Sequence, residues 1–324
     1  LVGDKKGFLL ESYDKNYDRY TFFGMEPEEI VTSRGNALVI TKADGTEEVR
    51  EGNPLERLKE YYSEFHIEKE DEELSFSGGL VGNLGYDFVR YSEVLPDNNP
   101  DEIGIETIQM MLMTSFLMVD HVAETLTAVV LEEPSEEGRE QAMEKAGQMI
   151  KKAMEKKECK RNFYHDGKII KKSDSIEEYG EKVEKIKHYI REGHVFQTVL
   201  SQRWTIETRQ TGFELYKELR ELNPSPYLYY FNYGTFEVIG SSPEMIVKKQ
   251  GNKVFTCPIA GTRKRGKDEA EDKRLRDELL SDEKERAEHV MLVDLARNDM
   301  GRISEFGTVK VTQFMEVQNY SHVM

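Results

Sequence analysis

The first 133 residues contain short stretches of apolar positions, which are separated by turn residues such as Ala43-Asp-Gly45. This spacing is typical of β-strands. We expect strands at residues 37–40, 76–88, 110–119 and 126–131, the last two joined as a hairpin. From Pro134 to Lys160 the composition changes to Glu, Lys, Ala and Met at helical spacing, which predicts a charged, exposed helix connecting two parts of the chain.

Both helices and strands are indicated in the second half of the chain. After Ser173-Asp-Ser175, apolar positions recur three and four residues apart as far as Ile190, so we expect a capped helix that ends near Gly193 and turns this stripe toward a core. Further expected elements are a strand at 195–205, a helix at 213–222, strands at 227–233, 235–239, 245–249 and 254–259, a polar segment at 263–282 and a helix at 283–298.

This succession predicts an α+β fold in which antiparallel sheets pack in layers with flanking helices. A parallel doubly wound sheet would show a regular alternation of strand and helix, and the chain lacks it. We place an N-terminal domain at residues 1–145, a charged connecting helix and linker at 146–172, and the first part of a second domain at 173–324. The candidate chemistry lies mainly in this second domain.

The chain of 324 residues has 62 acidic and 45 basic side chains, which gives a formal charge of −17. This balance disfavours binding to nucleic acid, because such binding depends on clustered Lys and Arg. It is also unfavourable for a small anionic substrate. Binding one would therefore require local cations, helix amino termini or a metal ion.

The sequence predicts neither a membrane span nor a secretion signal. The longest apolar run, at 110–119, is too short to cross a bilayer, and the residues after Leu1 lack the pattern of a signal peptide. Because no initiator Met is present, we expect the amino end to be trimmed. Cys159 and Cys257 lie far apart, which fits reduced thiols in a cytoplasmic protein.

A pair of carboxylates marks the last predicted helix. Glu285 and Glu288 are three residues apart, so both project from one face and repel each other. A hard cation between them would remove this repulsion, and carboxylate oxygens suit Mg²⁺. The alternative is a solvated acidic face whose charge is balanced by Lys284 and Arg286.

Two turns carry further candidate groups. In Ser241-Ser-Pro-Glu244 a carboxylate directly follows a strand and a proline, where it could be aimed as a general acid. Pro258-Ile-Ala-Gly-Thr262 ends a strand in a Gly-Thr step whose amides and hydroxyl could hold a carboxylate. Each could also be an ordinary structural turn. The histidines form no zinc-ligand spacing, and His194 and His289 are interpreted as structural.

Taken in order, these segments resemble the chorismate-utilising enzymes, and most closely the anthranilate synthase component I branch. The motifs that carry the resemblance span nearly the whole chain: Leu9-Leu-Glu-Ser12, Gly78-Gly-Leu-Val-Gly82 with Gly85-Tyr-Asp87, Phe196-Gln-Thr-Val-Leu-Ser201, Asn223-Pro-Ser-Pro-Tyr227, Ser241-Ser-Pro-Glu244, Pro258-Ile-Ala-Gly-Thr262, Glu288-His-Val-Met-Leu-Val-Asp-Leu-Ala-Arg-Asn-Asp299 and Tyr320-Ser-His-Val-Met324.

The resemblance implies a role for each part of the catalytic site. Mg²⁺ would be held through Glu285 and Glu288 and would bind the ring carboxylate of chorismate, while Glu244 would protonate the departing ring hydroxyl. Gly261 and Thr262 would contact chorismate. Two further positions distinguish branches of the family. Gln197 stands where isochorismate synthases carry a water-activating lysine, and Ala260 stands where aminodeoxychorismate synthases typically carry a nucleophilic lysine. Ammonia is therefore the expected nucleophile.

The resemblance also implies regulation and a partner. Family members bind tryptophan as a feedback inhibitor between two segments that correspond here to Glu11 and Ser12 on one side and to Pro226, Tyr227 and Leu228 on the other. The alternative for these residues is a plain domain contact. Ammonia would come from a glutamine amidotransferase subunit, component II, and the full-length protein would form a heterotetramer with it.

One departure from the family pattern concerns the carboxyl end. The chain ends at Met324, immediately before the position of the family's catalytic histidine, so His322 does not inherit that role, and we expect the polypeptide as given to be inactive. Two alternatives stay open: the sister enzyme aminodeoxychorismate synthase component I, and an inactive fragment that binds tryptophan or the amidotransferase.

Overall fold

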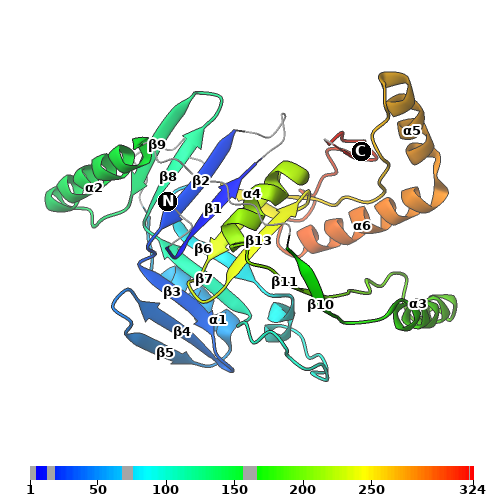
Figure 1. Ribbon diagram of the computed structural model, residues 1–324, viewed down its shortest axis with the longest axis horizontal. Coiled ribbons are helices and arrows are strands. Elements are labelled where there is room, and N and C mark those ends of the chain that lie inside the picture. Colours follow the sequence, from blue (N-terminus) through cyan, green and yellow to red (C-terminus); the bar gives the residue numbers. More distant parts are fainter. Residues whose placement is uncertain (1–4, 13–18, 68–75, 156–165, 321) are drawn as a thin grey trace. The chain divides into compact units, whose positions relative to one another are not determined.

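The computed structural model describes residues 5–12, 19–67, 76–155, 166–320 and 322–324 (Figure 1). By internal contacts the chain divides into a first unit, residues 1–156 and 216–324, and a second unit, residues 157–215. The predicted boundaries at 145 and 172 divide the chain differently. Residues 227–242, which we expected in the second domain, belong to the first unit because they complete a sheet that begins with residues 7–11.

The first unit contains a large antiparallel sheet, sheet A. Its strands in spatial order are β13 (Glu237–Ser242), β12 (Tyr227–Asn232), β1 (Gly7–Glu11), β2 (Tyr20–Met25), β8 (Ser115–Asp120) and β9 (Thr125–Val130). The register places Glu11 opposite Leu228, and Leu228 opposite Ser241. Two segments from the amino end and the middle of the sequence thus become neighbours.

A second antiparallel sheet, sheet B, belongs to the same unit. Its strands in spatial order are β5 (Glu47–Glu51), β4 (Ala37–Lys42), β3 (Glu29–Ser33), β7 (Ile108–Met113) and β6 (Gly79–Leu84). Gly82 lies directly opposite Met110, and a Cβ atom at position 82 would be 2.0 Å from the backbone oxygen of Gln109. The glycine is therefore required by close packing of two strands, as predicted for this glycine-rich segment.

The apolar run at 110–119 forms two strands rather than the single strand we expected. The break is at Thr114, where β7 in sheet B is followed by β8 in sheet A. The hydroxyl of Thr114 donates to Glu28 Oε1 at 3.1 Å, and its carbonyl accepts from the N–H of Leu131 at 2.7 Å. The predicted hairpin between this run and 126–131 is confirmed as the β8–β9 pair.

The core of the first unit contains residues of both sheets. Phe8 and Phe116 of sheet A are fully buried with Met111 and Met113 of sheet B. A second cluster, on sheet B, contains Val31, Leu38, Ile40, Tyr61 and Ile108. Alternating apolar positions on adjacent strands give sheets faces that must be covered, which explains the layered arrangement.

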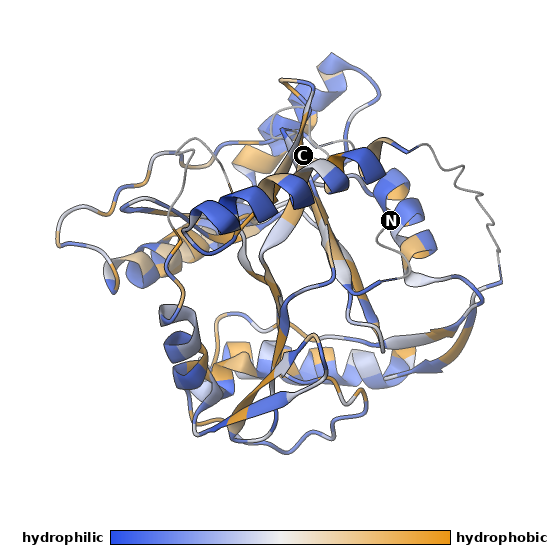
Figure 2. Cartoon of the chain, turned by 90° about the vertical axis from the view of Figure 1, so that its left-hand side faces the viewer, coloured by the Kyte–Doolittle hydropathy of each residue, from blue (hydrophilic) through white to orange (hydrophobic). Residues whose placement is uncertain are grey.

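Helices cover parts of these sheets. Helix α1 (Pro54–Ser63) begins at Asn53, whose side chain accepts from the N–H groups of Leu55 and Glu56, and it buries Tyr61 at sheet B. Helix α2 (Glu136–Met154) packs along β9 and confirms the predicted charged helix after residue 134. Most of its residues are exposed, and hydrophilic positions dominate the side seen in Figure 2. A 3₁₀ helix, η1 (Tyr86–Tyr91), follows β6.

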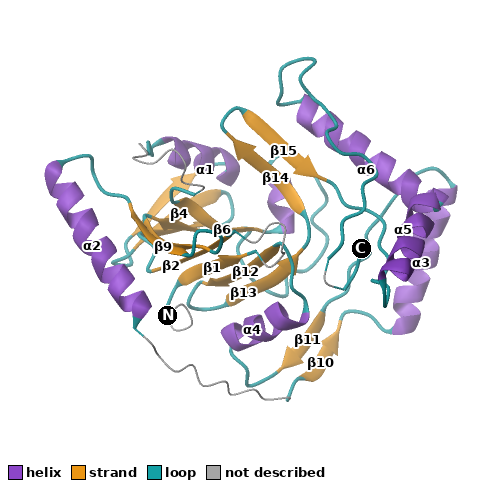
Figure 3. Ribbon diagram, turned by 90° about the horizontal axis from the view of Figure 1, so that it is seen from above, coloured by secondary structure: helices purple, strands orange, loops and turns teal. Residues whose placement is uncertain are grey.

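The remaining elements of the first unit lie near the carboxyl end of the sequence (Figure 3). In order they are α4 (Gly212–Leu222), which enters this unit at Tyr216, then β14 (Met245–Gln250), β15 (Lys253–Cys257), α5 (Glu269–Ser281) and α6 (Glu283–Gly301). Strands β14 and β15 form a hairpin. Helix α5 lies within the polar segment expected at 263–282, where no helix was predicted.

The second unit consists of β10 (Lys168–Lys172), α3 (Ile176–Arg191) and β11 (Trp204–Glu207). Ser175 and Glu178 form the capping box of α3, which confirms the predicted start of this helix. None of its residues is buried, so the expected core-facing stripe is at most half-buried in this unit. Of the strand expected at 195–205, only Trp204 and Thr205 lie in β11, because the pairing with β10 begins at Trp204.

The prediction of an α+β fold with layered antiparallel sheets and flanking helices is confirmed. Among the described residues, no helix is both long and apolar enough to span a bilayer.

Candidate functional site

The two predicted metal ligands lie at the start of helix α6. Asp282 caps this helix by accepting from the N–H groups of Lys284 at 3.0 Å and Glu285 at 3.2 Å. The cap fixes the first turn, so Glu285 and Glu288 project from one face of the helix. The Nζ atom of Lys284 lies 3.5 Å from Glu285 Oε1 and 3.6 Å from Glu288 Oε2. Both carboxylates therefore converge on one cationic nitrogen.

The glycine of the segment Pro258-Ile-Ala-Gly-Thr262 contacts this carboxylate pair. A Cβ atom at Gly261 would be 2.8 Å from Glu285 Oε2 and 2.8 Å from Leu279 Cδ1. Only the absence of a side chain lets the backbone approach the carboxylate so closely. The structure thus brings together two predicted parts of the site, Gly261 and Glu285. Ala260, which precedes Gly261, is half-buried, whereas Thr262, which follows it, is exposed.

Arg263 connects this segment to both flanking helices. Its guanidinium lies 3.1 Å from Glu278 Oε1 on α5, 2.9 Å from Asp282 Oδ2 at the cap and 3.6 Å from Glu285 Oε1 on α6. The backbone hydrogen bond from Glu285 and then the Arg263 guanidinium lower the pKa of Asp282 below its ordinary value. The sequence analysis missed Arg263, although an arginine directly after a substrate-binding segment and before an acidic helix was a usable signal.

The last residues of the chain pair with the same segment. The N–H of Arg263 donates to the carbonyl of Met324 at 3.0 Å, and the N–H of Met324 donates to the carbonyl of Arg263 at 2.8 Å. Lys264 and Val323 form the bridge, and Met324 is buried. Residues 322–324, which were recognised only as a motif, therefore pair with residues 263–265, which directly follow Gly261 and Thr262. Ser321 of this motif lies outside the described residues.

Glu244, the predicted general acid, lies in the turn between β13 and β14. Its N–H donates to Ser242 Oγ at 3.2 Å, which fixes the backbone of the turn. The Glu244 side chain is exposed, as are Pro243 before it and most of β14 after it. Burial, followed by the charge of Glu244, raises the pKa of the Cys257 thiol on the neighbouring strand. Cys257 is a free thiol, and Cys159 lies outside the described residues.

Gln197, the position expected to distinguish ammonia from water as nucleophile, belongs to the second unit. It lies in the segment between α3 and β11 and is exposed there.

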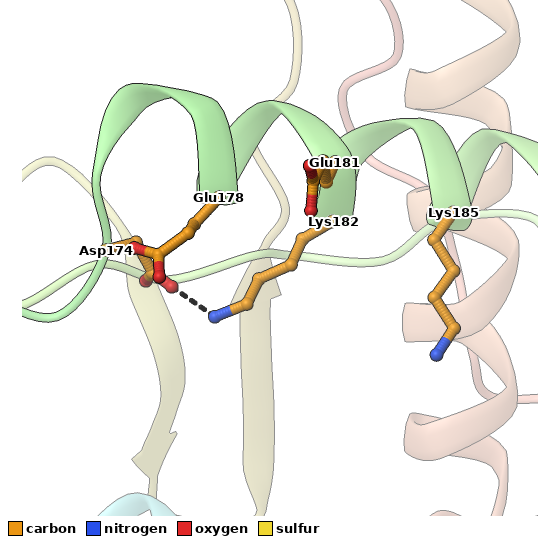
Figure 4. Close-up of a pocket in the computed structure, with 5 residues that line it drawn as sticks. All are labelled: Asp174, Glu178, Glu181, Lys182 and Lys185. Carbon is orange, nitrogen blue, oxygen red and sulfur yellow. Dashed lines mark hydrogen bonds and ion pairs between the residues drawn. The ribbon is translucent and has the colours of Figure 1, made fainter.

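The second unit also contains a surface hollow of about 260 Å³ at the start of α3 (Figure 4). Within it, Lys182 points toward Asp174 and pairs with it. One cation and one anion that line this hollow thus neutralise each other.

Glu11, the first predicted inhibitor-binding residue, is held by two groups of helix α4. The hydroxyl of Tyr216 donates to Glu11 Oε2 at 2.6 Å, and Arg220 Nε forms an ion pair with the same oxygen at 3.0 Å. Burial, and then the bond to Glu11, raise the pKa of the Tyr216 phenol well above its ordinary value. The sequence analysis missed both partners, since they come from a helix far away in sequence.

The other predicted inhibitor-binding residues are near Glu11 either in the sequence or across the β1–β12 pair of sheet A. Ser12 follows Glu11, and its buried Oγ has no hydrogen-bond partner within the described ranges. Pro226 and Leu228 are buried, whereas Tyr227 is exposed. Because Leu228 is opposite Glu11 in the β1–β12 pair, the structure brings the two predicted halves of this site together.

No group of three or more His, Cys, Asp or Glu side chains converges on one point in the part of the chain that the structure describes. A pair of carboxylates does converge, at Glu285 and Glu288, and it already holds one cation, the ammonium of Lys284. Two carboxylate oxygens that share one cation are suitable ligands for Mg²⁺, which retains waters as its remaining ligands. The donor set therefore fits this metal.

Comparison with known proteins gives consistent matches. The family described as chorismate binding enzyme matches residues 7–324. Anthranilate synthase component 1 of Acetivibrio thermocellus is 41% identical over 330 residues, and the match covers 98% of this chain and 67% of that protein. The Aquifex aeolicus protein of the same name is 40% identical over 328 residues, and the match covers 98% of this chain and 66% of that protein. The crystal structure of anthranilate synthase component I from Streptococcus pneumoniae TIGR4 superimposes with a TM-score of 0.79 at 31% identity, covering 94% of this chain and 68% of that one. The chain spans about two thirds of the length of these relatives.

Proposed function

Because the chain belongs to the chorismate-binding enzymes, and within them to the anthranilate synthase component 1 family, we propose that it takes part in converting chorismate and ammonia into anthranilate, pyruvate and water, the first step of tryptophan biosynthesis. One structural observation carries the proposal: the approach of Gly261 to Glu285 joins the predicted substrate segment to the carboxylate pair. An ordinary structural turn would not need this contact with an acidic helix.

The proposed cofactor is Mg²⁺, held by Glu285 and Glu288. Bound there, the cation would neutralise the ring carboxylate of the substrate. The chain itself has a formal charge of −17, so an anionic substrate needs this local compensation. The backbone of Gly261 is close enough to the carboxylate pair to position the same substrate group. Thr262, which is exposed, would offer its hydroxyl to the substrate.

Glu244 is the proposed general acid. Its carboxyl would give a proton to the ring hydroxyl, which leaves as water while ammonia adds at the far end of the conjugated diene, on the carbon next to the one that bears the carboxylate. Loss of the enolpyruvyl group as pyruvate then makes the ring aromatic. The turn that bears Glu244 is fixed by Ser242, so its backbone is ordered before substrate arrives. Exposure of the side chain allows it to be reprotonated from water after each turnover.

Two residues support ammonia as the nucleophile. Gln197 cannot remove a proton from water as a lysine would, and Ala260 has no group that could attack the ring. We therefore propose that ammonia is supplied by a glutamine amidotransferase, component II, in a cytoplasmic heterotetramer. The printed name of the relatives, component 1, supports the existence of a second component.

Tryptophan is the proposed feedback inhibitor, and its site would be formed by Glu11, Ser12, Pro226, Tyr227 and Leu228. Ser12 Oγ is an acceptor without a partner in the described parts of the chain, and Glu11 carries a negative charge beside it, so the two could receive the ammonium group of an amino acid. The buried side chains of Pro226 and Leu228 would offer apolar contacts for an indole ring.

An assay for anthranilate tests the proposed reaction. The full-length protein is incubated with chorismate, ammonium and Mg²⁺, and anthranilate is followed by its fluorescence. Glu244→Gln should lower kcat by about 10²- to 10⁴-fold, the range expected for loss of a general acid. Glu136→Gln, an exposed position on α2, is the matched control and should leave kcat unchanged. Accumulation of aminodeoxychorismate in place of anthranilate would contradict the proposal.

A further inference from the structure

Lys284 occupies the position between the two carboxylates of α6. Its Nζ atom lies 3.5 Å from Glu285 Oε1 and 3.6 Å from Glu288 Oε2, so one ammonium serves both groups. In charge and position this ammonium resembles the cation that the carboxylate pair would bind during catalysis.

A lysine at this place is unfavourable for the helix itself. Lys284 lies in the first turn of α6, next to the positive end of the helix dipole, where acidic residues are preferred. Its side chain also extends into solvent and is 78% exposed, so it buries little apolar surface. The carboxylates of Glu285 and Glu288 are the groups on the described chain that compensate for this placement.

Arg263 also approaches Glu285, but it is held differently. It lies 3.6 Å from Glu285 Oε1, yet its closer contacts are with Glu278 and Asp282, and its side chain is only 21% exposed. Lys284 has no comparable anchoring, because both of its ion pairs are with the carboxylate pair. Of the two cations, Lys284 is therefore the one that can move into solvent while Arg263 stays in place.

We infer that Lys284 is a built-in competitor of the divalent metal: its ammonium holds Glu285 and Glu288 together in the metal-free protein and swings out when the metal binds. The inference rests on the proposed metal site. It has two consequences. The like charges are compensated before the metal arrives, and the affinity for the metal is lowered by the free energy needed to break both ion pairs.

Metal titration of the full-length protein tests the inference. Isothermal titration calorimetry with Mg²⁺, and electron paramagnetic resonance with Mn²⁺ as a second probe, give the Kd of wild type and of Lys284→Met. Exposed ion pairs are weak, so removing two of them should tighten metal binding by about two- to tenfold. The matched control is Arg286→Met, which removes an equal charge from the same helix at a residue that points about 160° away from Lys284 around the axis. It should change Kd by less than Lys284→Met.

Thermal unfolding gives a readout that is independent of turnover. Without divalent metal, Lys284→Met should unfold at a lower temperature than wild type, because the two carboxylates then repel each other uncompensated. With saturating Mg²⁺ the difference should disappear. Arg286→Met should show no such dependence on the metal.

The possible failures are distinguishable. Equal Kd values for Lys284→Met and Arg286→Met would overturn the competitor role and leave the metal site intact, since a general change in charge would then explain both. The double variant Glu285→Gln, Glu288→Gln tests the metal site itself. If it bound the metal as tightly as wild type does, the proposed metal site would be overturned, and the inference with it.

Discussion

Gly261 lies so close to Glu285 that a single added methyl group would be 2.8 Å from the carboxylate oxygen Oε2. The relationship joins residues 24 positions apart in a chain whose helix α5 lies between them. The geometry of the candidate site is therefore determined by the packing of this glycine against the start of α6.

The first prediction follows from this contact. Gly261→Ala should displace the Glu285 side chain and reduce anthranilate formation more than tenfold, with a loss of stability of about 1–3 kcal/mol from overpacking. Both are measurable, by fluorescence assay and by urea unfolding. Gly147→Ala on α2 is the control, since a Cβ atom there meets nothing within 4 Å. It should leave activity unchanged and increase stability slightly. An active, stable Gly261→Ala protein would refute the proposed geometry.

Arg263 provides a second prediction. Arg263→Ala should lower the free energy of unfolding by about 2 kcal/mol, because it removes hydrogen bonds to charged partners on α5 and at the cap of α6. Urea unfolding at low ionic strength measures the loss. Arg297→Ala is a suitable comparison, since Arg297 forms one exposed pair with Asp294 on α6, worth well under 1 kcal/mol. Equal losses for the two variants would show that Arg263 does not connect the helices.

The third prediction concerns pH. In the folded protein the pKa of Asp282 is below its ordinary value of 3.8, because the N–H of Glu285 and then Arg263 stabilise the carboxylate. The stability from this group is therefore present above about pH 4 and is lost as the pH falls through the lowered pKa. Asp282→Asn keeps a cap oxygen but cannot ionise. It should be less stable than wild type at pH 7, and the difference should decrease toward pH 3 in urea titrations. A difference that does not change with pH would contradict this.

Regulation gives the fourth prediction. Tyr216→Phe removes the hydrogen bond that orients Glu11, so tryptophan should bind several-fold more weakly by calorimetry. Tyr62→Phe, at an exposed tyrosine of α1, should bind tryptophan as wild type does. Unchanged affinity in Tyr216→Phe, together with weakened affinity in Glu11→Gln, would mean that Glu11 needs no support from α4.

Much of the local structure was predictable because it depends on short-range patterns. The cap at Ser175, the start of α6 at Glu283 and the β8–β9 hairpin are all set by neighbouring residues. Helix α5 was missed because its residues are mainly charged and few apolar positions mark a face. Asp268, which accepts from the N–H of Glu271, was the available signal for its start.

Contacts between distant segments were accessible only where a family motif suggested them. The resemblance placed Glu11 with Leu228 and Gly261 with Glu285 in one site each, and the structure brings both pairs together. Neither periodicity nor composition could have paired Arg263 with Met324 or Tyr216 with Glu11, because such contacts depend on how whole elements pack. The exposure of Glu244 was likewise decided by its neighbours in space.

Thr114, where one strand leaves sheet B and the next enters sheet A, limits how the chain can misfold. A slip of one residue in either sheet would turn every side chain of that strand to the opposite face. Since β7 and β8 share a continuous backbone with a single residue between them, a slip in one sheet would force the same slip on the other. The first core would then lose the buried Met111, Met113 and Phe116, and the second would lose Ile108, so the correct register of each sheet protects that of its neighbour.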